Sequence, residues 1–557
     1  MTAVTHPRSR ALDLSMLRGG RFYLWMTLVA LAAAAISLHW PSTPSYDPWS
    51  WLIWGRQILH GSLGITGGSS WKPLPVIFTT FFALFGSVQP NLWLIVARAG
   101  ALMSVLMSAK LAGRITWSIV AQYRGGASLS ELSLGKRLGV IAPVALAVAI
   151  ALVGTTFTPT YPVPMMLGYS EGLGFAIALI AIERAWDGHH RQAFALGLLP
   201  CLDRPELWIV WGLYGLWLMW RDRRAIPLVL GLGVLMLTLW VALQLLGGGK
   251  ISDLFSHAQK NHAAHSSVNS SFPFWHELSI TLWPLALERV EAAALVMMAV
   301  TTWLLIRDRS DAGGWMAAMR RHGGPVAGSL AALAGFLWWI GVSLETQAGF
   351  AGNTRYAILG SLLVYVGGAA AFGWACLGLA RAGGALLQRR RQQGTSLSLR
   401  LGLSTVVMFA VFLYVPSWFS HRLPTVNGIR YALRYQAQLR DSFSDLIQRA
   451  GGAAKILKCG SIMTDNYQVT MLAWDLDRPI PVVQALPHKL EKNISGPNVV
   501  FQDGPVHPNR PGPTATQMAH WEKGWTQLNN SRYTIFHARP VTLYMDCTRY
   551  STGKNKS

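Results

Sequence analysis

The stretch SYDPWSWLIWGRQILHGSLGITGGSSWKPLPVIFTTFFALFG, residues 45–86, follows the first apolar segment of the chain. It contains a single acidic residue, Asp47, and its only arginine and lysine are Arg56 and Lys72. An ionised carboxylate beside a membrane is costly unless it caps a helix, pairs with a cation or takes part in function. We therefore expect Asp47 to be a functional group. Its surroundings are rich in tryptophan, namely Trp49, Trp51, Trp54 and Trp71.

The composition is typical of a membrane protein. The chain has 557 residues, of which 52% are hydrophobic and 13% are charged, and its mean hydropathy is +0.31. Soluble domains carry about 25% charged residues, whereas repeated apolar runs that can cross about 30 Å of hydrocarbon indicate a polytopic membrane protein. The formal net charge of +23 comes with Lys and Arg clustered in short loops, as in cytoplasmic loops of such proteins. We therefore expect membrane lipids, and no nucleic acid, as partners.

The apolar runs predict an α-helical polytopic membrane protein of about eleven transmembrane helices, followed by a C-terminal α/β domain. Residues 1–21 are expected to form a cytoplasmic tail, residues 22–417 the transmembrane domain, and residues 418–557 a soluble domain. An odd number of crossings places this last domain on the extracytoplasmic side. Two long outer loops are expected, at 39–90, with interfacial helices, and at 247–285. The style of the sequence is bacterial, and we expect the chain in the inner (plasma) membrane.

Two segments that contain proline are expected to lie at the outer face. Pro48 suits the first turn of a helix, which makes Asp47 the expected N-cap. Apolar residues recur at helical spacing over 51–58 and predict a short helix that lies in the membrane interface. The apolar run 192–220 is interrupted by the tetrapeptide DRPE at 203–206, and both of its flanks are basic. Because proline breaks helices, this run predicts two short helices with the corner at or near the outer face.

The C-terminal region contains two of the four cysteines. If the region is exported, Cys459 and Cys547 can form a disulfide that closes a long loop, worth about 3–5 kcal/mol in the chain-entropy model. Cys201 and Cys376 lie in apolar segments and are expected to be inert. None of the four cysteines has the spacing of a metal site.

Polar side chains from loops far apart in the sequence gather on the predicted outer face. A pocket with a few acids and several fixed cations suits transfer from an anionic lipid-phosphate donor. Arginine and lysine would hold the phosphate, and one carboxylate would remove the proton of an acceptor hydroxyl. The residues concerned are Asp47, Arg56, Lys72, Glu171, Asp203, Arg204, Glu206, Glu345, Asn353, Arg355 and Tyr356.

Each of these residues also has a purely structural interpretation. Asp47 could simply cap a helix, and Glu171 is favourable near a helix N-terminus because of the helix dipole alone. His257, His262 and His265 have a loosely plausible metal-ligand spacing, but Ser, Asn and Gln dominate around them, so we interpret them as a loop that covers the substrate. The remaining alternatives are headgroup anchors for Lys72, Arg56 and Arg355, and a local ion pair among Asp203, Arg204 and Glu206.

At these residues the sequence resembles glycosyltransferases of the GT-C fold, and among them the group of protein mannosyltransferases and aminoarabinose transferases. The common pattern is an acid after the first helix, a Gly-Gly turn, a Lys-Pro motif and an apolar stretch that ends in Leu-Phe-Gly. Many members carry a glutamate after the acid, where this chain has Pro48. The pattern here reads Asp47, Gly67-Gly68, Trp71-Lys72-Pro73-Leu74-Pro75 and Leu84-Phe85-Gly86, joined by the Arg204-Pro205-Glu206 corner and by Arg355-Tyr356 before a late helix.

The resemblance implies inverting transfer of a sugar, such as arabinofuranose or mannose, from a polyprenyl-phosphate donor to an extracytoplasmic glycan, lipid or protein acceptor. It makes Asp47 the general base. We expect no cofactor and no metal ligands in the site, and leave metal dependence open. The expected donor-phosphate contacts are Lys72, Arg204, Arg355 and Arg56, and the expected sugar or acceptor contacts are Glu171, Glu206, Tyr46, Trp71, Tyr356 and His262.

Two functions from other classes stay open at this point. A lipid or glycan transporter or flippase would typically place ionisable residues at mid-membrane depth and carry an internal repeat. Here the ionisable residues gather at one face, and the sequence shows no repeat. A non-catalytic protein of cell-envelope assembly, with the C-terminal domain as a binding module, is the second alternative.

Overall fold

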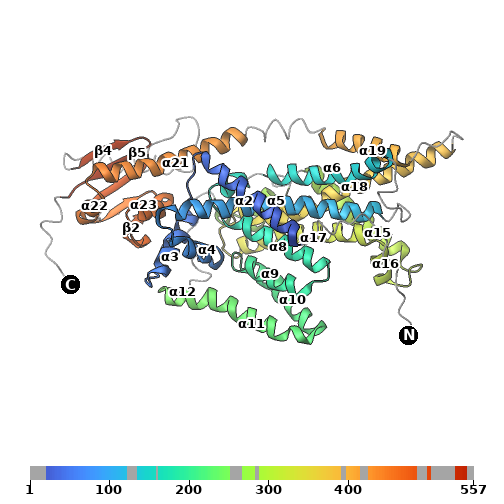
Figure 1. Ribbon diagram of the computed structural model, residues 1–557, viewed down its shortest axis with the longest axis horizontal. Helices are drawn as coiled ribbons and strands as arrows, with labels where there is room; N and C mark the ends of the chain where they lie inside the picture. The colour runs from blue at the N-terminus through green and yellow to red at the C-terminus, as the bar shows by residue number, and fades with distance from the viewer. Residues whose placement is uncertain are drawn as a thin grey trace.

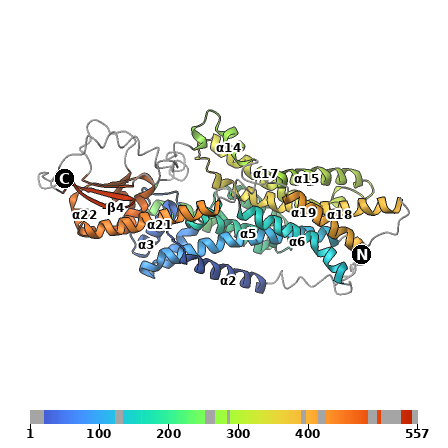
Figure 2. The same cartoon turned by 90° about the horizontal axis from the view of Figure 1, so that it is seen from above.

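The structure is a computed structural model in which residues 20–121, 134–158, 161–250, 266–282, 288–389, 397–413, 425–485, 498–503 and 533–547 are described. The molecule is elongated, with a long helical bundle and an α/β domain at one end of it (Figures 1 and 2). Helices α3 (Tyr46–Leu59) and α4 (Pro73–Ala83) lie between the bundle and the α/β domain (Figure 1).

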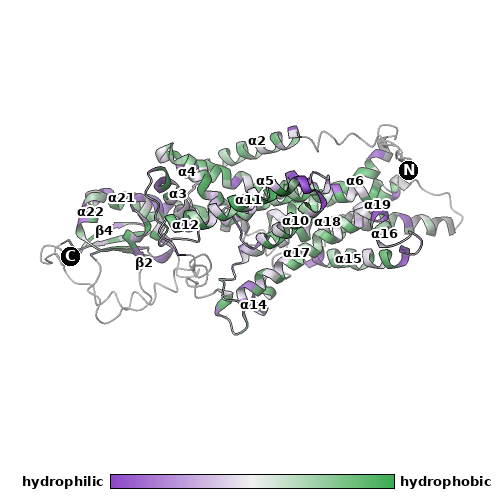
Figure 3. Cartoon of the chain, turned by 90° about the horizontal axis from the view of Figure 1, so that it is seen from below, coloured by the Kyte–Doolittle hydropathy of each residue, from purple (hydrophilic) through white to green (hydrophobic). Residues whose placement is uncertain are grey.

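The bundle is made of apolar helices, and hydrophobic residues cover most of their length (Figure 3). Among the longest of them, α5 and α18 are the most buried. Short helices α7 (Pro162–Met166), α14 (Pro273–Thr281) and α16 (Trp315–Arg321) connect some of the long ones. The other helices of the bundle are α2 (Gly20–Ile36), α5 (Gln89–Ala121), α6 (Leu134–Thr156), α8 (Glu171–Trp186), α9 (His190–Cys201), α10 (Leu207–Arg221), α11 (Ile226–Leu237) with α12 (Leu243–Leu246), α15 (Glu288–Asp308), α17 (Gly323–Gln347), α18 (Ile358–Arg389) and α19 (Leu397–Leu413).

Within the described part of the chain, seven helices are long and apolar enough to cross a membrane. The predicted polytopic helical protein is therefore confirmed, but the count of about eleven crossings is not. The difference arises from apolar helices that are shorter than the roughly 20 residues needed to span the hydrocarbon core. Those helices are α8, α9, α10 and α19, of 16, 12, 15 and 17 residues.

The apolar run 192–220 is broken as predicted. Helix α9 ends at Cys201 and α10 begins at Leu207, so the DRPE tetrapeptide forms the corner between them. The corner is held by its own backbone, since the amides of Asp203 and Arg204 both donate to the carbonyl of Pro200. Asp203 and Arg204 are nevertheless buried, with 0% and 4% of their surfaces exposed. The corner therefore places charged groups inside the protein, where they need partners.

The C-terminal domain has an α/β fold, as predicted, around a five-stranded sheet of order β2-β1-β3-β5-β4. Strand β1 (Ile462–Thr464) pairs in parallel with β2 (Val483–Ala485) and with β3 (Val499–Asp503). Strand β5 (Val541–Met545) pairs antiparallel with β3 and with β4 (Thr534–Ala538). The helices of the domain are α21 (Thr425–Arg449), α22 (Ala453–Cys459) and α23 (Val469–Asp475).

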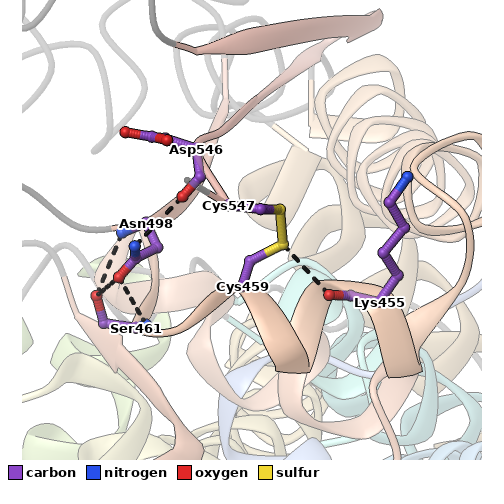
Figure 4. The surroundings of a disulfide bond; sticks show 6 residues. All are labelled: Lys455, Cys459, Ser461, Asn498, Asp546 and Cys547. Carbon is purple, nitrogen blue, oxygen red and sulfur yellow. Dashed lines mark hydrogen bonds between the residues drawn. A yellow bond between two sulfur atoms is a disulfide. The ribbon is translucent and has the colours of Figure 1, made fainter. Parts of the chain in front are cut away.

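The predicted disulfide between Cys459 and Cys547 is present (Figure 4). It joins the last residue of α22 to the segment that follows β5, and 88 positions separate the two cysteines in the sequence. Next to it, Asn498 donates to the carbonyl of Asp546 at 3.3 Å and accepts from the amide of Ser461 at 3.2 Å. The other two cysteines, Cys201 and Cys376, are free and buried.

Loss of this disulfide is expected to destabilise the C-terminal domain. Cys459→Ser should lower its free energy of unfolding by about 4 kcal/mol, because the bond closes a long loop in the unfolded chain. Thermal unfolding of the purified protein in detergent, with and without reductant, measures the effect. The matched control is Cys376→Ser, which changes a buried free cysteine and should respond to reductant as the wild type does. Equal melting temperatures for Cys459→Ser and the wild type would contradict the prediction.

Candidate active site

Helix α3 begins earlier than the sequence predicts, and this changes the role of Asp47. The N-cap is Ser45, whose backbone is extended and whose amide donates to the carbonyl of Leu167 at 3.0 Å. Asp47 therefore lies inside the first helical turn, and the prediction that it is the N-cap was wrong. Its carboxylate is directed to another part of the molecule, where Oδ2 accepts a hydrogen bond of 2.7 Å from Nη2 of Arg355.

Helix α3 is buried on more than the single stripe that the sequence indicates. Trp49, Trp51 and Trp54 each expose 1% of their surface or less. On one side α4 packs closely, because a Cβ at Gly55 would lie 2.5 Å from the backbone carbonyl carbon of Thr79. On another side the C-terminal domain covers the helix. The predicted interfacial helix is thus enclosed by protein.

Lys72 lies between two buried carboxylates. Its Nζ is 3.2 Å from Oε1 of Glu171 and 3.5 Å from Oδ1 of Asp203, and both acids are completely buried. Ser170 also donates to Oδ1 of Asp203, at 2.5 Å. Burial lowers the pKa of Lys72, but the charges of Asp203 and Glu171 outweigh it, and the net shift is upward. Burial raises the pKa of Asp203 despite the opposing charge of Lys72, so this carboxyl group holds its proton more firmly than an exposed aspartate does.

Two arginines complete the cluster. Besides its bond to Asp47, Arg355 has Nη1 3.7 Å from Oε1 of Glu171. Its guanidinium carbon lies 4.1 Å from the ring centre of Tyr169 and 5.3 Å from that of Tyr356. Arg204 stacks on the same Tyr356 ring at 3.9 Å, so the tyrosine brings the two guanidinium groups to one place.

Both guanidinium groups keep unused hydrogen-bond donors. Within the described part of the chain, Nε and Nη2 of Arg204 and Nε and Nη1 of Arg355 are buried and have no hydrogen-bond partner. The nearest carboxylate of Arg204 is that of Glu206, at 3.7 Å, which is longer than a hydrogen bond. Buried donors are normally satisfied, so these N–H groups are suited to an anion. We call the whole group the polar cluster: Asp47, Lys72, Tyr169, Ser170, Glu171, Asp203, Arg204, Glu206, Arg355 and Tyr356.

The structure thus brings together six of the predicted contact residues with the predicted base. The predicted residues in the polar cluster are Asp47, Lys72, Glu171, Arg204, Glu206, Arg355 and Tyr356. Asp203 had been noted in the corner without an assigned role. The sequence shows Asp203 only as a second acid next to Arg204. Its contact with Lys72 could not be predicted, because the two residues are far apart in the sequence.

Other predicted contact residues lie elsewhere. Arg56 pairs with Asp477 of the C-terminal domain at 2.6 Å and is not part of the polar cluster. Trp71 packs on Trp54 and donates to a backbone carbonyl in the segment after α11. Tyr46 packs against Tyr467 of the C-terminal domain. His262 lies outside the described residues.

The polar cluster has no set of residues suited to a metal ion among those that the structure describes. Among the residues that the structure describes, no group of three or more His, Cys, Asp and Glu side chains could hold a metal ion. The acids of the polar cluster instead face lysine and arginine. The histidines that suggested metal spacing, His257, His262 and His265, fall in a segment outside the described residues.

Comparison with known proteins gives structural neighbours only. No protein-family model and no curated protein matches the sequence. ArnT from Cupriavidus metallidurans in the apo state matches with 13% identity and a TM-score of 0.44, over 94% of this chain and 97% of that chain. The same protein bound to undecaprenyl phosphate matches with 12% identity and a TM-score of 0.45, over 94% of this chain and 97% of that chain. A third match is the archaeal oligosaccharyltransferase AglB from Archaeoglobus fulgidus, in complex with an inhibitory peptide and a dolichol-phosphate. It has 11% identity and a TM-score of 0.46, over 96% of this chain and 75% of that chain. Because these values are low, we take the chemistry from the residues of this site.

Removing the central lysine is expected to destabilise the bundle. Lys72→Met removes the cation from between Glu171 and Asp203 and leaves Glu171 only its longer contact with Arg355, at 3.7 Å. Loss of one partner of a buried pair costs about 3–5 kcal/mol. Thermal unfolding in detergent measures the loss. The double variant Lys72→Met/Asp203→Asn removes one of the stranded charges and should recover part of it. A melting temperature for Lys72→Met equal to that of the wild type would show that the cluster does not depend on the lysine.

Proposed function

We propose that this chain is a membrane glycosyltransferase of the GT-C type. It moves a sugar from a polyprenyl-phosphate donor to an acceptor hydroxyl, with inversion at the sugar carbon. The observation that carries the proposal is the polar cluster, in which one carboxylate and two guanidinium groups with unused donors lie together in a buried place. That combination offers a base for the acceptor and a binding site for the phosphate that leaves.

Asp47 acts as the general base. One of its oxygens, Oδ2, is held by Arg355 at 2.7 Å, and within the described residues no side chain or amide donates to Oδ1. That oxygen is therefore free to accept the proton of the acceptor hydroxyl while the hydroxyl oxygen bonds to the sugar carbon. The bond from this carbon to the phosphate oxygen breaks, and its electron pair stays on the phosphate. Because the hydrogen bond from Arg355 already fixes the carboxylate, the base can act without reorganisation.

Arg204 and Arg355 hold the donor phosphate. Their unpartnered N–H groups supply charge-assisted hydrogen bonds to the phosphate oxygens, which are among the strongest in proteins. Lys72 has three N–H donors. It donates one to Glu171 at 3.2 Å and lies 3.5 Å from Asp203, and we assign a remaining donor to the same phosphate. Glu171 keeps the cations in place, and Glu206 and Tyr356 contact the sugar. The sugar is arabinofuranose, mannose or a related residue.

We place the site and the C-terminal domain outside the cytoplasm, in the plasma membrane of a bacterium. The disulfide supports this side of the membrane, because such bonds persist in oxidising compartments and are rare in the cytosol. The N-terminus would then be cytoplasmic. The acceptor is a hydroxyl group of a cell-envelope glycan, lipid or protein, since the reaction needs only a nucleophilic oxygen near Asp47.

Asp47→Asn is expected to slow transfer strongly and leave donor binding intact. The amide can still accept the bond from Arg355 but cannot take up a proton, so kcat should fall by about 10²–10⁴. The measurement is transfer of radiolabelled mannose, glucose and arabinofuranose from polyprenyl phosphate, in nanodiscs. The matched control is Asp222→Asn, which changes a partly exposed aspartate paired with Arg191 after α10.

The outcomes separate the classes of function. Undiminished transfer by Asp47→Asn would move the base to another carboxylate. Transport of intact labelled lipid across a vesicle membrane by the wild type, without sugar transfer, would instead establish a transporter. Donor binding without transfer or transport, with cell-envelope acceptors present, would establish an assembly protein.

Donor affinity is expected to depend on the two arginines. Arg204→Gln should weaken binding of polyprenyl phosphate about 10- to 100-fold, which corresponds to about 1.4–2.8 kcal/mol, the strength of one hydrogen bond to a charged group. Binding to the purified protein, followed by intrinsic fluorescence or calorimetry, measures the effect. Arg221→Gln, a change of the same chemistry at the other end of α10, is the control. Equal weakening by both variants would show that the effect is a general one of charge.

A further inference from the structure

One face of the C-terminal domain contacts the helix that carries Asp47. The hydroxyl of Thr470, in α23, donates to the backbone carbonyl of Tyr46 at 2.9 Å. Thr470 is completely buried, and Tyr46 directly precedes Asp47. The hydrogen bond therefore fixes the peptide unit to which the carboxylate is attached.

The same face holds α3 along its length. Trp474, at the end of α23, packs against Trp49 with 5.4 Å between ring centres. Arg56 lies over the Trp474 ring at 4.6 Å and pairs with Asp477 at 2.6 Å. Because these contacts are made at Tyr46, Trp49 and Arg56, they are spread along α3 and leave the helix little freedom to rotate or slide.

The contact extends to the glycine turn that precedes Lys72. Gly67 and Gly68 have φ angles of +79° and +83°, which side chains other than glycine rarely adopt. A Cβ at Gly68 would lie 2.7 Å from Cδ1 of Ile480 and 2.9 Å from Oγ of Ser50. The turn is thus enclosed between α3 and the segment after α23. Both segments that deliver charged groups to the polar cluster, one with Asp47 and one with Lys72, are held by this face.

Tyr467 lies at the same boundary. Its ring centre is 6.3 Å from that of Tyr46. Burial raises the pKa of Tyr467, and the negative charges of Asp465 and Asp47 raise it further. The phenol is therefore within the electrostatic reach of the proposed base, which agrees with a domain face that borders the site.

We propose that the C-terminal domain is a working part of the site, in which Thr470 is a positioning residue for Asp47. The inference rests on the proposed function, in which Asp47 is the base. A general base must lie within hydrogen-bond reach of the proton that it takes, and a displacement of about 1 Å can cost 10²-fold in rate. Because Thr470 holds the peptide unit beside Asp47, loss of its hydroxyl displaces the carboxylate and leaves the phosphate-binding arginines in place.

The test compares three variants of the full chain. Thr470→Val removes the hydroxyl and keeps the shape, and kcat should fall about 10- to 100-fold with unchanged affinity for polyprenyl phosphate. Thr470→Ser restores the hydroxyl and should restore kcat. The matched control is Thr464→Val: Thr464 is buried in β1 of the same domain, and its hydroxyl donates to the carbonyl of Phe501 at 2.9 Å. It should lower the melting temperature to a similar degree without lowering kcat at a temperature where the protein is folded.

A second readout does not depend on catalysis. Hydrogen–deuterium exchange of the peptide over residues 45–59 should be faster in Thr470→Val than in the wild type and in Thr464→Val. Exchange and kcat unchanged in Thr470→Val would overturn the positioning role, as would an equal fall of kcat in both valine variants. Faster exchange together with full transfer by Asp47→Asn would instead show that the domain positions α3 and that the assignment of the base fails.

Discussion

Compensation of buried charge is the constraint on which the site depends. Lys72 lies between Glu171 and Asp203, and neither carboxylate is exposed. Away from water an ionised group is stable only beside opposite charge or strong hydrogen bonds, so the position of each group is dictated by the others. Lys72 comes from the first loop, Glu171 from α8 and Asp203 from the corner between α9 and α10. One electrostatic requirement therefore holds together three segments that share no local sequence signal.

The same requirement leads outward to the reacting groups. Arg355 lies near two carboxylates, those of Asp47 and Glu171. Arg204 stacks on Tyr356 and makes only a long contact with Glu206. The carboxylates hold the cations in place without using all of their hydrogen-bond donors. In the proposed reaction, these unpartnered N–H groups bind the phosphate of the anionic donor. A site whose dipoles and charges already point to the place of the ligand avoids the cost of reorganising them.

Sequence reasoning found much of the site because single charges in apolar surroundings are conspicuous. Asp47, Lys72, Glu171, Arg204 and Arg355 were identified for that reason, and the break at DRPE followed from its proline. Arg56 satisfied the same criterion, but its partner, Asp477, lies near the other end of the chain, and no spacing links the two. The start of α3 was missed because Ser45 and Asp47 are both good N-caps. The structure has Ser45 as the cap, and its amide is bonded to the carbonyl of the distant Leu167, which no local pattern indicates. The number of crossings could not be predicted, since the apolar runs of α8, α9, α10 and α19 form helices of at most 17 residues.

The contact between α3 and α23 also sets an order of events in biosynthesis. Helix α3 leaves the ribosome well before Thr470 and Trp474, which contact it, have been made. Until the α/β domain has been made and has folded, Trp49 lacks its contact with Trp474 and the carbonyl of Tyr46 has no donor from Thr470. Membrane insertion of the helices alone therefore yields an incomplete site. In the proposed reaction, a newly made chain would therefore transfer sugar only after the α/β domain has folded against α3.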